Sequence, residues 1–137
     1  MKKTFTAMVV AFFVAAPAFA EGTLNIYNWG NYTSPEMIEK FEKDYDVNVT
    51  ITDYDSNDTA LAKIKAGGHG FDIVVPSGTY IPIFVGESLL MELDPSEFKN
   101  FGNIDARWMD VAFDPGRKYS VPWQWGTVGV TVNTAVY

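Results

Sequence analysis

TLNIYNWGNYTSPEMIEKF, residues 23–41, places a strand, an aromatic loop and a helix in direct succession. Residues 23–27 alternate and are rich in strand formers. Thr33 or Ser34 can cap the helix that follows, with a proline in its first turn. The loop between strand and helix carries Trp29 and Tyr32, and ligands of open α/β sheets bind at such loops. We therefore expect a ligand, and in an acidic chain a cationic one, to cover these two exposed rings.

The alternation of strand and helix continues to residue 75. Residues 47–51 predict a second strand, and Ser56 or Asn57 can cap a second helix that ends in the glycine run of residues 67–70. Residues 71–75 are nearly all apolar, which predicts a third strand buried on both faces. This β-α-β-α-β order with short connections predicts an α/β fold whose parallel strands are joined by right-handed crossovers.

Other segments predict further elements with less regular patterns. The first helix carries apolar residues at helical spacing, which predicts a buried stripe formed by Met37, Ile38, Phe41 and Tyr45. Residues 81–90 predict a third helix, and residues 92–118 are rich in loop signals with room for short helical turns. Residues 119–122 and 126–133 predict two more strands, the latter containing VGVTV.

The first 20 residues have the pattern of a secretory signal peptide. Lys2 and Lys3 precede the apolar run of residues 8–16, and Ala18-Phe19-Ala20 fits a cleavage site. The chain has no cysteine, so it has neither a disulfide nor a site for a cysteine-linked lipid. These features predict a soluble periplasmic protein.

The charge balance is acidic, with a formal net charge of −7. Such a surface repels nucleic acids and anionic lipids and concentrates cations, although it also serves solubility alone. The single histidine, His69, lies in a glycine turn, and no nucleophile motif, phosphate loop or dinucleotide fingerprint occurs. We therefore expect no enzymatic activity, no cofactor and no metal site.

Aromatic and polar residues follow several of the predicted strands. Trp29 and Tyr32 follow the first, residues 53–55 the second, Ser77 the third, and Trp125 comes after residues 119–122. Because the carboxyl ends of parallel strands share one edge, these residues can line one cleft. Purely structural roles are the alternative for some of these residues, since Ser77 can cap the next helix and residues 55–57 can form a turn and a cap.

In this order, several segments resemble the periplasmic polyamine-binding proteins that feed ABC importers for spermidine and putrescine. The resemblance covers nearly all of residues 22–134 and rests on LNIYNWGNYTSPE, FEKDYDVNV, DYDSND, FDIVVPS, MELDPSEF, FDPGRKYSVPWQWG and VGVTVN. It implies a periplasmic-binding-protein-like fold of two lobes that close on a small ligand. It also implies transient contact with an inner-membrane permease by a monomeric protein.

The resemblance assigns ligand contacts to individual residues. Trp29 and Tyr32 match the first aromatic wall of the family, Ser77 matches a serine that lines the cleft, and Trp125 matches an indole at the lobe boundary. Between its tryptophan and tyrosine the family has a hydroxyl residue and an acid, where this chain has Gly30 and Asn31. Gly30 and Asn31 complete the expected set of ligand-binding residues. Because the acid is missing, the sequence does not indicate which polyamine the protein prefers.

The expected organisation is a signal peptide at residues 1–20, a first lobe at residues 21–126, and a hinge strand at residues 127–137 that leads to a second lobe absent here. Because most carboxylates that bind the amine in relatives would lie in that lobe, we expect this chain alone to bind polyamine weakly or not at all. Other readings are a binding protein for a different small cation, an amino-acid-like ligand or a metal chelate, a secreted hydrolase, and a truncated product without activity.

Overall fold

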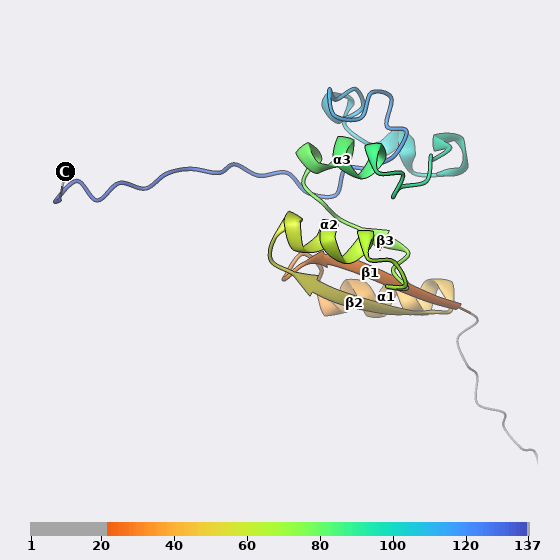
Figure 1. Cartoon of the computed structure of the whole chain (residues 1–137). Helices are drawn as coiled ribbons and strands as arrows, with labels where there is room; N and C mark the ends of the chain where they lie inside the picture. Colours follow the sequence, from red (N-terminus) through yellow and green to blue (C-terminus); the bar gives the residue numbers. More distant parts are fainter. Residues whose placement is uncertain (1–21, 137) are drawn as a thin grey trace, which may run out of the picture.

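The computed structural model describes residues 22–136 and contains a small parallel sheet with a helix on each face (Figure 1). The central strand β1 (Gly22–Trp29) lies between β2 (Val47–Tyr54) and β3 (Ile73–Val74). β1 is parallel to both neighbours and pairs with β2 along its whole length. The predicted α/β fold with a parallel sheet is therefore confirmed.

The two helices that follow β1 and β2 are α1 (Pro35–Tyr45) and α2 (Asn57–Lys65). With the strand order β2-β1-β3, right-handed crossovers place them on opposite faces of the sheet. Ser34 caps α1 by accepting a hydrogen bond from a backbone N–H of its first turn, and Ser56 caps α2 in the same way. Of the two candidates at each start, the serine is the cap.

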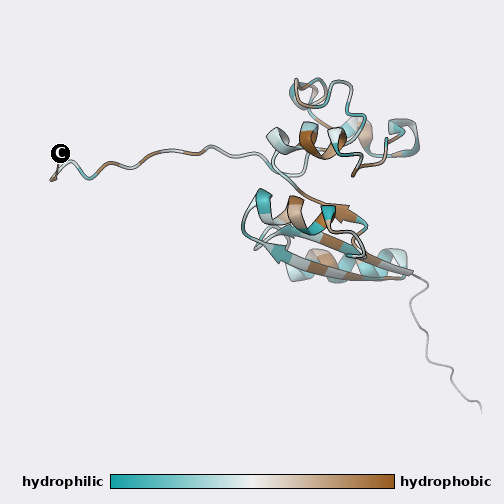
Figure 2. Cartoon of the chain, viewed as in Figure 1, coloured by the Kyte–Doolittle hydropathy of each residue, from teal (hydrophilic) through white to brown (hydrophobic). Residues whose placement is uncertain are grey.

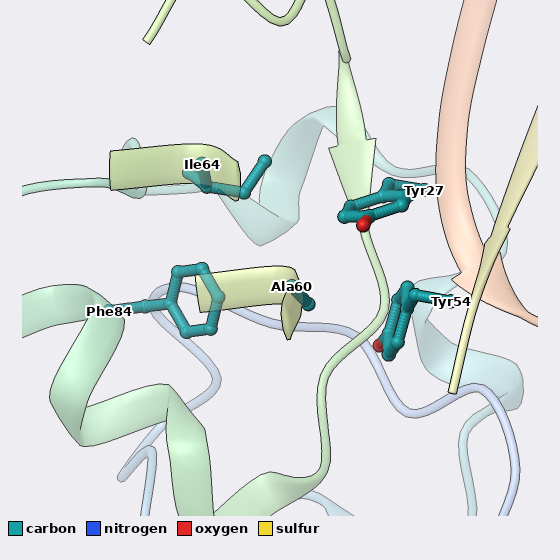
Figure 3. Close-up of a cluster of buried hydrophobic side chains, with 5 residues drawn as sticks. All are labelled: Tyr27, Tyr54, Ala60, Ile64 and Phe84. Atoms are coloured by element: carbon teal, nitrogen blue, oxygen red, sulfur yellow. The ribbon is translucent and has the colours of Figure 1, made fainter. Parts of the chain in front are cut away.

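The hydrophobic core lies between the sheet, α2 and α3 (Ile81–Gly86). Figure 3 shows the aromatic rings of the sheet beside the inward side chains of α2, with the α3 phenylalanine packed against α2. Ala60 and Phe84 are completely inaccessible to solvent. The residues that form this core are Tyr27, Tyr54, Ala60, Ile64 and Phe84.

The predicted buried stripe of α1 is wrong, because α1 contains no buried residue. Met37, Phe41 and Tyr45 are 41%, 39% and 67% exposed. On its face of the sheet α1 packs against β2, and the described sheet has too few strands to cover the whole stripe. For the same reason β3 is not buried on both faces, since Ile73 is also exposed.

Two predicted elements are shorter than expected. The predicted strand at residues 71–75 is assigned only at Ile73–Val74, although Asp72 and Val75 each donate a backbone hydrogen bond to β1. α3 ends at Gly86 instead of continuing to residue 90, and Ser88 adopts a left-handed conformation that the helix cannot continue through. Residues 92–118 contain loops and three short 3-10 turns, as predicted.

The strands predicted at residues 119–122 and 126–133 do not form in the described structure. A strand needs a neighbour for its backbone N–H and C=O groups, and residues 126–133 extend away from the sheet (Figure 1). Figure 2 shows hydrophobic stretches along this segment, and its valines are largely exposed, with Val128 at 103% and Val130 at 91%. The assignment of residues 127–137 as a hinge stays a prediction.

The predicted signal peptide, residues 1–20, lies outside the described residues. Among residues 22–136, no helix has both the length and the apolar character that a membrane crossing requires.

Candidate ligand-binding site

A cavity of about 620 Å³ opens to solvent at the carboxyl ends of β1 and β2. Its walls come from β1 and the loop after it, from the end of β2, and from the first turn of α2. This is the edge at which open α/β sheets bind ligands. The lining residues are Tyr27, Trp29, Gly30, Tyr32, Asp53, Tyr54, Asp55 and Thr59.

Aromatic rings form one wall of the cavity. Trp29 lies opposite Tyr54 in the register of the parallel strands, and their ring centroids are 4.6 Å apart. The Tyr32 ring follows at 6.4 Å from the Trp29 ring, and Tyr27 lies behind Tyr54 at 4.8 Å. This wall presents partly exposed ring surface, which attracts cations and covers apolar carbon chains.

Tyr54 connects this wall to the core. The residue is buried and its hydroxyl donates a hydrogen bond to the carbonyl oxygen of Val75. Burial raises the pKa of the Tyr54 phenol far above its ordinary value of 10.0, and the neighbouring Tyr27 and Tyr32 raise it further. The Tyr54 phenol is therefore neutral at physiological pH.

Two carboxylates, Asp53 and Asp55, supply the charge of the cavity. Neither forms a hydrogen bond or an ion pair with another of the described side chains. Some acids elsewhere in the chain are engaged, such as Asp58, which accepts a hydrogen bond from the Tyr80 hydroxyl at 2.7 Å, and Asp72, which accepts one from the Asn25 backbone at 2.8 Å. The cavity thus combines an aromatic wall with two carboxylates that are free of intramolecular partners within residues 22–136.

Three of the expected contact residues, Trp29, Gly30 and Tyr32, line the cavity, and the others do not. Asn31 adopts a left-handed conformation with φ of 63° in the turn after β1, which asparagine tolerates. Ser77 is paired with Asn57 through two hydrogen bonds of 2.9 and 3.0 Å.

Trp125, the remaining expected contact, is 73% exposed and stacks on Trp108 with 6.1 Å between ring centroids. The side-chain amide of its neighbour Gln124 donates a hydrogen bond of 3.2 Å to the Tyr32 carbonyl. This bond brings the segment that carries Trp125 against the aromatic loop, although Trp125 itself is not part of the cavity wall.

A compact loop precedes this segment and is built around two buried charges, Asp114 and Arg117, each 3% exposed. Asp114 accepts hydrogen bonds from the backbone of Lys118 and Tyr119 and from the Ser120 hydroxyl. Arg117 donates to the Trp108 carbonyl and to the same hydroxyl. These bonds order the chain up to residue 120.

Five further residues line the cavity: Asp53, Tyr54 and Asp55, which the sequence argument placed at this edge without assigning them as ligand contacts, and Tyr27 and Thr59, which it did not place there. A signal existed for the end of β2, because parallel strands share their carboxyl-terminal edge. No sequence pattern indicated Thr59 as a cavity residue, because the packing of α2 brings it there. Within residues 22–136, no three acidic, histidine or cysteine side chains gather as a metal site would require.

A comparison with protein families matches residues 29–137 to the bacterial extracellular solute-binding proteins. The chain is 36% identical over 135 residues to the putrescine-binding periplasmic protein SpuD of Pseudomonas aeruginosa, covering 96% of this chain and 37% of SpuD. It is 38% identical over 121 residues to the spermidine/putrescine-binding periplasmic protein of Salmonella typhimurium, covering 88% of this chain and 35% of the relative. The chain thus spans about a third of the length of these relatives.

Solved structures agree with these relationships. The spermidine/putrescine ABC transporter substrate-binding protein PotD of Streptococcus pneumoniae matches with a TM-score of 0.72 and 38% identity, over 74% of this chain and 32% of PotD. The TpPotD lipoprotein of Treponema pallidum matches with a TM-score of 0.69 and 40% identity, over 74% of this chain and 32% of that protein. The described fold is therefore part of a lobe of this architecture.

Proposed function

Because the chain belongs to the bacterial extracellular solute-binding protein family, we propose that it is part of a periplasmic protein that binds putrescine or spermidine for uptake by an ABC importer. The names of its relatives support this ligand class and this location. The proposed role is binding alone, with no reaction catalysed and no cofactor. A transient contact between a monomer and an inner-membrane permease completes the proposal.

The observation that carries the proposal is that one cavity combines aromatic rings with two carboxylates that have no partner within residues 22–136. A polyamine alternates ammonium groups with methylene chains. The rings of Trp29 and Tyr32 can cover the methylenes and attract the charge, and Asp53 or Asp55 can accept charge-assisted hydrogen bonds from an ammonium group. The net charge of −7 favours the approach of such a cation.

The proposed contact set extends beyond the cavity walls. Trp29, Gly30 and Tyr32 are supported by their position in the cavity. Asn31, Ser77 and Trp125 are proposed on the family resemblance alone. Since the chain spans about a third of its relatives, we expect the amine to bind in the millimolar range rather than with the affinity of a closed site.

The test is a titration of the chain with putrescine, spermidine and the uncharged diol of the same chain length as putrescine. The readout is the indole N–H resonance of Trp29 in an NMR spectrum, with the resonance of Trp123, which does not line the cavity, as internal control. We expect both amines to shift Trp29 and the diol to leave it unchanged. Equal responses to amine and diol, or no response to either amine, would contradict the proposal.

A further inference from the structure

Gly30 has no side chain at a position where neither the backbone nor the packing requires a glycine. It is not among the glycines with a positive φ, so other residues can adopt its conformation. A Cβ atom built there would lie 3.6 Å from Oδ2 and 3.9 Å from Cγ of Asp53 and, apart from its chain neighbours, would approach no other atom of the described residues within 4 Å. The missing side chain therefore has one local consequence, which is an uncovered Asp53 carboxylate.

Asp53 is also the better fixed of the two carboxylates in the cavity. It lies within β2 and pairs in register with the buried Asn28 of β1. Asp55 follows the end of the strand, in the connection to the Ser56 cap of α2. A group held by a sheet loses less conformational freedom when it binds a ligand, and a larger share of the interaction then appears as affinity.

We propose that Asp53 is the residue that binds an ammonium group of the ligand in this chain, and that Gly30 keeps its carboxylate open to the cavity. The inference rests on the proposed function and adds to it a residue that determines specificity for cations. It assigns to the end of β2 the negative charge that Gly30 and Asn31 do not provide on the aromatic loop.

The first experiment compares Asp53→Asn with a matched control, Asp46→Asn. Both changes remove one negative charge with little change in volume, and Asn suits the left-handed conformation of Asp46. Asp46 precedes β2 and Asp53 lies near its end, so the control is at the opposite end of the strand. With putrescine and the Trp29 resonance, we expect the dissociation constant to rise about tenfold for Asp53→Asn, as for loss of a charge-assisted hydrogen bond, and to stay unchanged for Asp46→Asn.

The second experiment tests the role of Gly30 with Gly30→Val, alone and combined with Asp53→Asn. Valine would cover the carboxylate, so we expect weaker putrescine binding in the parent chain and little further loss when Asp53→Asn is already present. Such non-additivity is the mark of two residues that act through one interaction. Equal losses in both backgrounds would overturn the role of Gly30.

The failures of the two proposals are distinguishable. If putrescine shifts Trp29 equally in the parent chain and in Asp53→Asn, the polyamine function stands and the assignment of Asp53 is overturned. If putrescine shifts Trp29 in neither, both proposals fail. A dispersed amide spectrum of each variant, matching that of the parent outside the cavity, shows that folding is intact.

Discussion

At the scale of single residues, Tyr54 shows how one side chain serves both the core and the cavity. Its ring packs between Tyr27 and Trp29, and its hydroxyl bonds to the Val75 carbonyl just after β3. The chain crosses from β2 through α2 to β3 between these two residues. The hydrogen bond therefore ties the end of β2 to the end of β3 and supports the aromatic wall from behind.

We expect Tyr54→Phe to lower the free energy of unfolding by about 1 kcal/mol, because the partly buried carbonyl of Val75 loses its hydrogen-bond donor. Urea denaturation measures this change. The control is Tyr45→Phe, which removes a hydroxyl that is exposed on α1 and has no partner among the described residues. Equal effects of the two substitutions would contradict the role given to the Tyr54 hydroxyl.

The raised pKa of Tyr54 also predicts a pH dependence of stability. As the pH rises above the ordinary value of 10.0, the unfolded chain loses the phenolic proton while the folded protein retains it. The unfolded state then binds fewer protons, so the free energy of unfolding falls with pH. We expect this alkaline fall to be smaller in Tyr54→Phe than in the parent chain, measured by urea denaturation across that pH range. An identical fall in both would show that Tyr54 does not contribute.

At the scale of elements, the two sides of the sheet are stabilised differently. α2 contributes Ala60 and Ile64 to the core and α3 adds Phe84, while α1 buries no residue. Sequence periodicity predicted an apolar side for α1 correctly, but it could not say how much surface would cover that side. The amount of surface depends on how many strands lie beneath the helix.

This difference predicts unequal effects of two similar truncations. Phe84→Ala removes a fully buried ring and should cost about 3–5 kcal/mol of unfolding free energy. Phe41→Ala removes a ring that is 39% exposed and should cost about 1 kcal/mol or less. Denaturant unfolding compares the two, and Phe84→Leu serves if Phe84→Ala does not fold. A greater loss from Phe41→Ala than from either Phe84 variant would contradict this description of the core.

At the scale of the whole molecule, the segment after residue 120 packs little against the rest of the described chain. Its side-chain contacts to earlier residues include the Gln124 bond to Tyr32 and the stacking of Trp125 on Trp108. Beyond them, residues 126–133 lie apart from the sheet (Figure 1) with their valines exposed. Alternating valines favour a strand, yet a strand is stable only beside another one.

Hydrogen exchange followed by NMR tests this difference. We expect the amides of residues 127–132 to exchange at rates close to those of an unstructured peptide. The β1 amides that are bonded to β2 should be protected, because their opening requires the sheet to separate. Protection of alternate amides within residues 127–132 would instead indicate a strand partner and contradict the described conformation.

The sequence by itself determined the order of strands and helices through β3, the start of each main helix to within two residues, and the aromatic loop at the strand edge. These features depend on periodicity and on caps, which act over a few neighbouring residues. Only the tertiary structure decided that α1 stays exposed, that the valine-rich segment has no strand partner within residues 22–136, and that Ser77 and Trp125 stay outside the cavity that Asp53 shares with Trp29. These outcomes depend on contacts between segments distant in the chain, such as Gly30 with Asp53, and no local pattern contains them.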